Sequence, residues 1–292
     1  GYHGHTQTGI DISEYKFNHP KGQGQKSHIL KTAIPKKYKG RYEGKNEPGV
    51  LYAKEAIEQL NKNENSIAAF IAEPIVGCGG QVPLASGYLK TLYPEIRKKG
   101  GLCISDEVQT GFGRLGSVFW GFELHGVIPD MVVLGKPMAN GHPMGAVVAS
   151  EEVAASFAEG VEFFSSFGGN PVSCAIGKAV LEVIDEEKLQ KNALEVGKYY
   201  CSLLKELQKE DARIGDVRGE GLFLGVELIN EHEKPNTELA QLLKNELRNR
   251  HVLISTDGPA DSVIKTKPPI LFTKSNAERV VSEIKRALKI YR

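Results

Sequence analysis

The sequence predicts an α/β large domain followed by a small α+β domain. Three short apolar runs, at residues 68–72, 102–105 and 131–134, are bounded by Gly, Pro or acidic residues. Runs of this length and setting are typical of buried strands in a sheet that helices cover. Farther along, residues 214–228 alternate in polarity and contain glycines, which indicates a hairpin outside that sheet.

Length and composition fit this organisation. The chain has 292 residues, of which 40% are hydrophobic and 25% charged, enough for a large core. Its net charge of +1 offers no field of one sign for nucleic acid or an anionic membrane. No apolar run is nearly long enough to span a membrane, and the amino-terminal residues do not have the pattern of a signal peptide. The four cysteines lack the CxxC spacing of metal-binding and redox motifs. We therefore predict a cytoplasmic protein without nucleic-acid partner, membrane partner or metal site.

The other elements are predicted from apolar periodicity and cap residues. Residues 9–49 are polar and rich in Gly and Lys, which predicts an irregular excursion over the surface. We expect helices at 53–61, 86–99, 151–159, 237–250 and 275–290, and strands at 146–149, 252–255 and 263–265. The first of these strands, at 146–149, is a short apolar run and should be fully buried. The predicted N-caps are Ser86, Ser150, Asn170 and Ser275, the last in a capping box with Glu278.

A domain boundary is predicted near Asp185. The helical period from residue 172 to 209 is longer than one ordinary helix, so two helices should meet within it. We place residues 1–185 in the large domain and 186–292 in the small one.

Lys136 follows the run 131–134 in a turn rich in Gly and Pro. A lysine at the end of a buried strand should be desolvated, which disfavours its charge and leaves a nucleophilic amine. Such an amine can form a Schiff base. The alternative is a lysine that extends from the loop into solvent.

Asp106 directly follows the run 102–105. Ligands of open α/β sheets bind at the carboxyl ends of the strands, so Asp106 and Lys136 should reach one edge. Pyridoxal phosphate requires a lysine and a carboxylate against its pyridinium nitrogen, and this pair supplies both. A structural ion pair at the sheet edge is the alternative.

Three segments resemble the signature blocks of class III pyridoxal-phosphate aminotransferases of the ornithine and 4-aminobutyrate type. They are DEVQTGFGR at residues 106–114, GKPMANGHPMGAVV at 135–148 and SSFGGNPVSCA at 165–175. The resemblance implies a fold-type-I transferase with pyridoxal 5'-phosphate as cofactor. Its large domain has a mainly parallel sheet with flanking helices, and its small α+β domain lies at the carboxyl end.

The resemblance also assigns roles at the cofactor. Lys136 and Asp106 take the catalytic roles described above. Tyr2 would stack on one face of the pyridine ring, with His3 nearby. The alternative for this pair is a frayed, solvated terminus.

Three further positions are assigned in the same way. Val108 would lie against the other ring face and Gln109 near the ring hydroxyl. Ser166 stands where most relatives have threonine, and its hydroxyl would reach the cofactor phosphate of a neighbouring subunit. That role implies a homodimer with shared active sites. The alternatives are a core valine and a turn or capping serine.

Two positions bear on the substrate. By resemblance Glu73 lies near the substrate pocket, although a surface-loop carboxylate is the alternative. Many class III transaminases place an arginine before a Pro-Pro turn, where this chain has Lys267. The ammonium of lysine is a point charge, whereas the planar guanidinium of arginine donates two parallel hydrogen bonds to a carboxylate. Lysine therefore suits a phosphate at least as well as a carboxylate. A solvated Lys267 is the alternative.

With residues 255–259, this turn resembles the phospho-lyase branch, which acts on ethanolamine phosphate or phosphohydroxylysine, although alanine–glyoxylate relatives share the KPP turn. We predict an enzyme acting on a small primary amine, leaning to elimination of phosphate and ammonia from a substrate such as phosphoethanolamine. The first alternative is a true transaminase of the alanine–glyoxylate, 4-aminobutyrate or ornithine type. The second is an inactive carboxyl-terminal fragment, because the family carries a long portion before the YHG motif that we expect to be missing here. A nicotinamide dehydrogenase is disfavoured because no GxGxxG follows a predicted strand.

Overall fold

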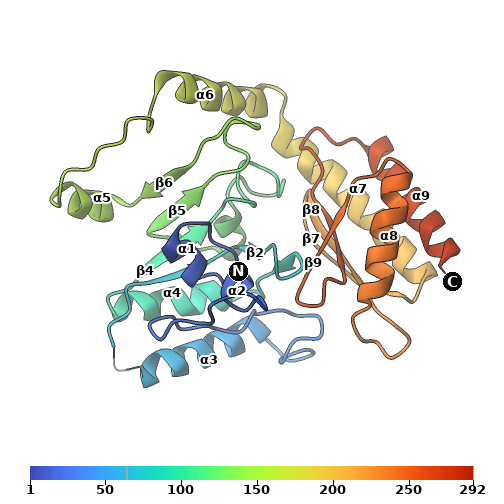
Figure 1. Cartoon of the computed structure of the whole chain (residues 1–292), viewed down its shortest axis with the longest axis horizontal. Helices are drawn as coiled ribbons and strands as arrows, with labels where there is room; N and C mark the ends of the chain where they lie inside the picture. The colour runs from blue at the N-terminus through green and yellow to red at the C-terminus, as the bar shows by residue number, and fades with distance from the viewer. Residues whose placement is uncertain (64, 292) are drawn as a thin grey trace.

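The computed structural model describes residues 1–63 and 65–291, and a four-stranded sheet lies at the centre of its first half (Figure 1). Three neighbouring strands run parallel and the fourth is antiparallel at the edge. In spatial order they are β1 (Ala69–Ala72), β4 (Leu102–Asp106), β5 (Met131–Leu134) and β6 (Ala146–Ala149). These strands confirm the four predicted apolar runs, within one residue at each end.

Helices flank this sheet. α3 (Pro48–Lys62) and α4 (Tyr88–Lys98) pack together, and their apolar faces share one cluster with Cys103 of β4. α6 (Pro171–Glu186) contributes Ile184 to a second cluster with Leu134 of β5. The result is the predicted layered arrangement, with the carboxyl ends of β1, β4 and β5 at one edge.

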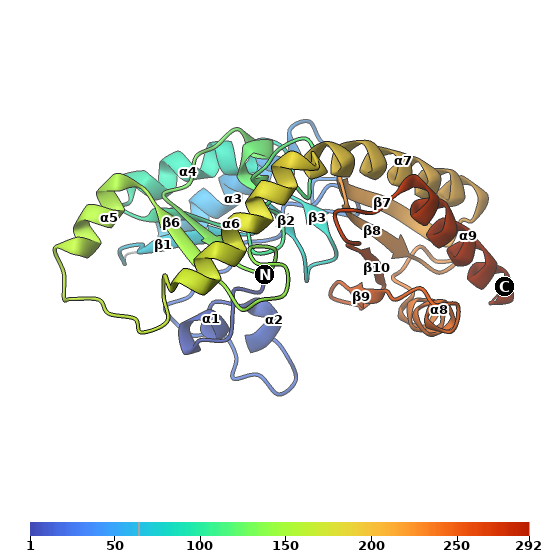
Figure 2. The same ribbon diagram turned by 90° about the horizontal axis from the view of Figure 1, so that it is seen from above.

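The amino-terminal segment is irregular, as predicted. It contains two short helices, α1 (Gln7–Asp11) and α2 (Glu14–Phe17), followed by turns and extended chain to residue 47. Figure 2 shows this segment beside the sheet, near the amino terminus. Smaller elements connect the large ones: β2 (Ile75–Val76), β3 (Val82–Pro83), the 3-10 helix η1 (Gly121–His125) and α5 (Glu151–Ala158).

The second half is built on an antiparallel sheet with α7 (Leu189–Glu210) against β7 (Figure 2). Its strands, in spatial order, are β7 (Ile214–Glu220), β8 (Phe223–Leu228), β10 (Val263–Thr266) and β9 (Ser255–Asp257). The hairpin predicted at 214–228 is confirmed. α8 (Thr237–Asn249) and α9 (Lys274–Ile290) complete this unit.

Two helices meet near the predicted domain boundary. α6 ends at Glu186, and α7 begins after Lys188, which takes a left-handed conformation with φ 53°. An apolar cluster running from Tyr200 to Leu288 lies wholly within the second half. The division into 1–185 and 186–292 agrees with these features and stays a prediction.

Two helix caps are confirmed and two are wrong. Ser150 and Asn170 accept backbone N–H bonds from Val153 and Ser173 at 3.4 and 2.9 Å. The helix predicted from 86 begins at Tyr88, because Gly87 takes the N-cap position with φ 88°. The closing helix is capped by Thr273, which forms a capping box with Asn276. Ser275 and Glu278 therefore form no such box.

Two strand predictions need correction. Val252 donates its N–H to Leu247 O at 2.9 Å and so closes the end of α8, which moves the strand predicted at 252–255 to 255–257. The prediction that 146–149 is buried is also wrong. Val147 and Val148 are 57% and 55% exposed, since β6 is the edge strand of its sheet.

The helices of the described residues are all too short or too polar to span a lipid bilayer. All four cysteines are free thiols.

Candidate active site

The carboxyl ends of β4 and β5 bring Asp106 and Lys136 to one edge of the sheet. Asp106 lies opposite Val133 in the parallel register, and Glu107 N donates to Val133 O at 2.9 Å. Lys136 follows this pair in the turn after β5. The preceding glycine is in close contact with Val108, since a Cβ at that position would lie 3.2 Å from Val108 Cγ1. Asp106, Val108 and the turn of Lys136 therefore form one group, as predicted.

Asp106 is a buried, oriented carboxylate. It is 4% exposed, its Oδ2 lies 2.8 Å from Nδ1 of His3, and its Oδ1 accepts the N–H of Val108 at 3.1 Å. The Nδ1–H tautomer of His3 can donate to this oxygen of the carboxyl group. Each carboxylate oxygen can accept more than one bond, so the group can still receive a pyridinium N–H. The residues present fit that part of pyridoxal phosphate.

The amino-terminal residues are packed against the site rather than solvated. His3 N donates to Ser13 Oγ at 2.8 Å, and its side chain is only 6% exposed. The ring of Tyr2 lies edge-on to Tyr15, with 5.9 Å between centroids, and Lys16 Nζ lies 5.1 Å from the Tyr2 ring centre. The solvated-terminus alternative is therefore wrong for His3, and ring stacking by Tyr2 stays a prediction.

Lys136 is exposed, which contradicts the prediction of a desolvated amine. The turn 135–145 leaves the sheet edge, and nothing in the described part of the chain covers the lysine. Its amine forms no hydrogen bond or ion pair within residues 1–63 and 65–291. It is thus accessible to a carbonyl group, the partner that Schiff-base chemistry requires.

A second group joins Glu73, Gln109 and Lys267. Glu73 follows β1, is 4% exposed, and accepts the N–H of Gly77 at 3.0 Å through Oε2. Gln109 Nε2 lies 3.5 Å from the same oxygen, and Gln109 Oε1 accepts from Lys267 Nζ at 2.5 Å. Carboxylate, amide and amine are thus connected in a row. The surface-loop alternative for Glu73 is wrong.

Burial favours the neutral forms of both Glu73 and Lys267. It raises the pKa of Glu73, against the opposing effect of the Gly77 N–H bond. It lowers the pKa of Lys267 to about 8, and Lys265 adds to this, while Asp257, Glu73 and Cys78 oppose it. Lys267 Nζ also lies 4.6 Å from the ring centre of Phe223. The solvated alternative for Lys267 is wrong, and the desolvated lysine of this site is Lys267.

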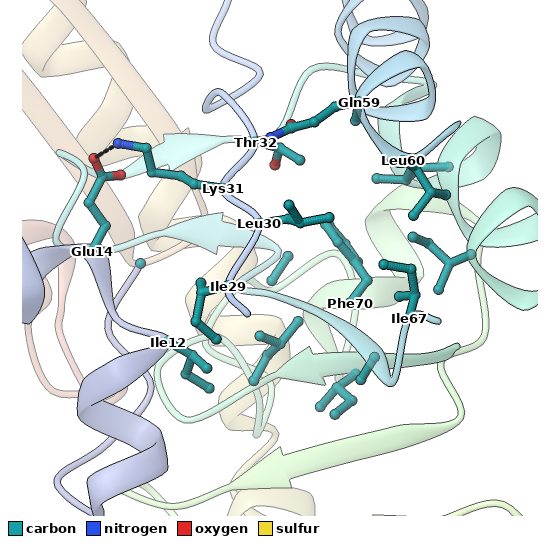
Figure 3. Close-up of a pocket in the computed structure, with 18 of the residues that line it drawn as sticks. Ile12, Glu14, Ile29, Leu30, Lys31, Thr32, Gln59, Leu60, Ile67 and Phe70 are labelled. Atoms are coloured by element: carbon teal, nitrogen blue, oxygen red, sulfur yellow. Dashed lines mark hydrogen bonds and ion pairs between the residues drawn. The ribbon is translucent and has the colours of Figure 1, made fainter. Parts of the chain in front are cut away.

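A cavity of about 650 Å³ adjoins the site, with His3 and Glu73 among its lining residues. It lies between β1, α3 and the extended chain before α3, and its walls are mostly apolar (Figure 3). Figure 3 labels Ile12, Leu30, Leu60, Ile67 and Phe70 on these walls. An ion pair of 2.6 Å between Glu14 and Lys31 lies at the same cavity.

Ser166 does not join the other predicted residues. It is exposed in the segment between α5 and α6, which projects from the sheet in Figure 1. It forms no hydrogen bond with the rest of the described chain. Its proposed role at a neighbouring subunit stays a prediction.

Sequence reasoning missed Glu107, although it stands beside Asp106 in the acidic pair that opens the motif block. It is fully buried and accepts from Ser105 Oγ, Thr110 Oγ1, Gly121 N and Phe122 N at 3.2, 2.6, 2.8 and 2.8 Å. Glu107 therefore folds the loop after β4 back on itself, which fixes the backbone that carries Asp106 and Gln109.

Arg114 was also missed, and a lone arginine in a glycine-rich stretch was its only signal. Its Nη1 donates to Leu222 O and Pro268 O at 3.2 and 2.7 Å. Burial lowers the pKa of this guanidinium, which has no carboxylate partner among the described residues.

A lysine and a buried carboxylate at neighbouring strand ends, beside an antiparallel sheet, form the arrangement expected of a pyridoxal-phosphate-dependent enzyme of fold type I. The model of the family "Aminotransferase class-III" matches residues 1–288, and the chain belongs to this family. The fold class and the family resemblance are thereby confirmed, and pyridoxal phosphate is the cofactor of the family.

Two curated relatives carry different activities in their names. The chain is 45% identical to an alanine–glyoxylate aminotransferase 2-like protein of Drosophila melanogaster, covering 98% of this chain and 60% of that protein. It is 36% identical to ethanolamine-phosphate phospho-lyase homolog 1 of Caenorhabditis elegans, covering 99% of this chain and 66% of that protein. The chain thus spans about three-fifths to two-thirds of the length of these relatives.

The similar solved structures likewise include both a phospholyase and transaminases. A phospholyase from Arthrobacter in complex with phosphoethanolamine has a TM-score of 0.91 at 34% identity, over 99% of this chain and 69% of that one. An omega transaminase from Pseudomonas jessenii in complex with PMP also has a TM-score of 0.91, at 26% identity, over 99% and 66%. Relatives of both branches of the family are thus similar to this chain. Relatives from human and Arabidopsis thaliana are named mitochondrial, so a cytoplasmic location stays a prediction.

Proposed function

We propose that the chain carries the catalytic lysine and carboxylate of an enzyme that acts on a small primary amine. The observation that carries this proposal is the placement of buried Asp106 and accessible Lys136 at the ends of adjacent parallel strands. When bound, pyridoxal phosphate supplies an electron sink for the negative charge left by proton removal from the substrate.

The residues of the chain would have different roles in this reaction. Asp106, held by His3 and by the Val108 N–H, keeps a proton on the ring nitrogen. The amine of Lys136 would hold the cofactor and would also serve as the base that takes the proton from the substrate carbon bearing nitrogen. Val108, Tyr2 and Gln109 are proposed to position the ring.

The proposed substrate carries a phosphate. Lys267 offers a cationic amine beside Gln109, and its point charge suits phosphate. The phospholyase whose structure holds phosphoethanolamine supports this choice. Loss of phosphate from the carbon next to the deprotonated one completes the elimination. With one water, phosphoethanolamine would give acetaldehyde, ammonia and inorganic phosphate.

Transamination is the second candidate, since the fly relative is named for it and needs the same lysine and carboxylate. The two are separated by incubating the chain and pyridoxal phosphate with phosphoethanolamine, or with L-alanine and glyoxylate. Our proposal predicts equimolar phosphate and ammonia from the first mixture, and neither product with Lys136→Ala. Pyruvate and glycine from the second mixture, without phosphate from the first, would establish the transaminase. No product and no cofactor absorbance band would establish the inactive fragment.

A homodimer is also part of the proposal. The segment around α5 exposes large apolar side chains, which are 62–94% accessible: Phe157, Val161, Phe163, Phe164 and Phe167. Contiguous apolar exposure of this kind is typical of protein interfaces. Ser166 lies among them, which supports its delivery to a neighbouring subunit. Four free thiols support a reducing, cytoplasmic location.

A further inference from the structure

Arg114 ties the loop after β4 to two places in the second half of the chain. Its Nη1 donates to the carbonyl of Pro268 at 2.7 Å and to that of Leu222 at 3.2 Å. Its own carbonyl accepts the N–H of Leu222 at 3.0 Å. Arg114 and Leu222 therefore hold each other by both side chain and main chain.

The backbones at this junction are in direct contact. Gly221 has φ 53°, and a Cβ there would lie 2.6 Å from Arg114 O and 2.5 Å from the carbonyl carbon of Leu115. Such distances exclude any side chain, so the turn between β7 and β8 can approach the loop only through glycine. The position of the β7–β8 turn against the loop of Arg114 is thus fixed by direct backbone contact.

One carbonyl that Arg114 holds is next in sequence to Lys267, and the other is next to a residue that contacts Lys267. Pro268 follows Lys267 directly, so the carbonyl that Arg114 fixes belongs to the turn carrying the lysine. Leu222 precedes Phe223, which is fully buried and whose ring centre lies 4.6 Å from Lys267 Nζ. Gln109, which accepts from the same amine at 2.5 Å, belongs to the same loop as Arg114.

We infer that Arg114 is a positioning residue, which sets the amine of Lys267 between the amide of Gln109 and the ring of Phe223. The inference deepens the proposed function, on which it rests, because Lys267 is the residue proposed to receive the substrate phosphate. A planar guanidinium donates to carbonyls in fixed directions, whereas an ammonium on a flexible stem fixes no direction. The residue touches neither substrate nor reacting atoms and acts through Lys267.

The test measures the reactivity of Lys267 in the full chain without cofactor or substrate. Competitive acetylation from pH 6 to 11, read by peptide mass spectrometry, gives the midpoint at which each lysine amine becomes reactive. Lys267 should have its midpoint near pH 8 in the wild-type chain, because burial and Lys265 lower its pKa while Asp257, Glu73 and Cys78 oppose them. In Arg114→Met the freed turn should let the amine reach water, and the midpoint should rise by at least about one pH unit toward that of an ordinary lysine. Arg114→Lys, which keeps a cation in the fold, should give an intermediate rise.

Gln190→Ala is the matched control. Gln190 Nε2 donates to Gly116 O at 3.1 Å, so this change loosens the same loop without touching Pro268 or Leu222. Lys136 is the internal reference in each sample. An unchanged Lys267 midpoint in folded Arg114→Lys and Arg114→Met, or an equal rise in Gln190→Ala, would overturn the inference. Failure of cofactor chemistry would leave this measurement intact, so the two proposals fail separately.

Discussion

Lys267 Nζ lies 2.5 Å from Oε1 of Gln109, a contact between residues 158 positions apart. It joins the turn after β10 to the loop after β4, and so brings the antiparallel sheet to the carboxyl edge of the parallel one. The proposed substrate end of the site exists only because the two halves of the chain meet here.

Phosphate binding should weaken as pH rises through the pKa of Lys267, which is about 8. The ammonium form attracts the anion, and a lowered pKa removes this charge well below the usual lysine range. Phosphoethanolamine affinity, measured by calorimetry, should fall about tenfold from pH 7 to pH 9, a range in which a phosphate monoester keeps its charge.

Lys267→Arg is the control for this pH dependence. A guanidinium stays protonated throughout the range, so this variant should lose the decrease. The same tenfold weakening in Lys267→Arg would show that another group is responsible.

Glu107 should be a major determinant of stability. Glu107→Ala would leave four donors in a buried loop without an acceptor, at a cost of about 3 kcal/mol or more in the free energy of unfolding. Glu107→Gln keeps one acceptor oxygen and should lose less. Urea denaturation measures both, with Glu206→Ala at an exposed pair as the control expected to change little. A loss below about 1 kcal/mol in Glu107→Ala would contradict the role of the carboxylate.

Asp106→Asn should impair turnover while leaving the fold intact. The amide cannot hold a proton on the ring nitrogen, so we expect a loss of roughly a hundredfold or more in kcat, as for other lost electrostatic contacts. Steady-state kinetics with whichever substrate is turned over provides the measurement. The control is Asp130→Asn, which alters a carboxylate that binds Arg97 and the N–H of Cys103 away from the site. Equal losses in both variants would indicate a structural role for Asp106.

The apolar segment around α5 should support dimerisation. Phe164 and Phe167 are 80% and 85% exposed, and changing both to Asp would place charges in the proposed interface. Analytical ultracentrifugation should show a dimer for the wild-type chain and a monomer for the double variant. Leu253→Asp, at an 85% exposed position of the other half, should remain dimeric. A wild-type monomer, or a double variant that still dimerises, would refute the proposed interface.

The strands and the Asp106–Lys136 edge could be predicted because they depend on local pattern and a general rule. Short apolar runs mark strands, and parallel strands bring the residues at their carboxyl ends to one edge. The helix N-caps were harder to predict, since neighbouring residues compete for the N-cap position. Gly87 replaces Ser86, and Thr273 replaces Ser275, because both candidates suit a cap and tertiary packing selects between them.

The environments of the two lysines could not be predicted from local sequence. The side chain of Lys136 is exposed because no distant segment of the described chain covers it, and Lys267 is half-buried because Phe223 and Gln109 lie against it. The contact between His3 and Asp106 likewise joins residues 103 positions apart. Solvation of a side chain is a tertiary property, which a strand-end pattern leaves open.

The most direct test of the central claim locates the lysine that binds pyridoxal phosphate. The chain is incubated with the cofactor, the covalent bond is reduced with borohydride, and the modified peptide is identified by mass spectrometry. We predict a single stoichiometric adduct on Lys136, and loss of both the adduct and the visible absorbance band in Lys136→Ala. An adduct on Lys267, whose amine is the desolvated one, or no adduct at all, would contradict the proposed role of Lys136.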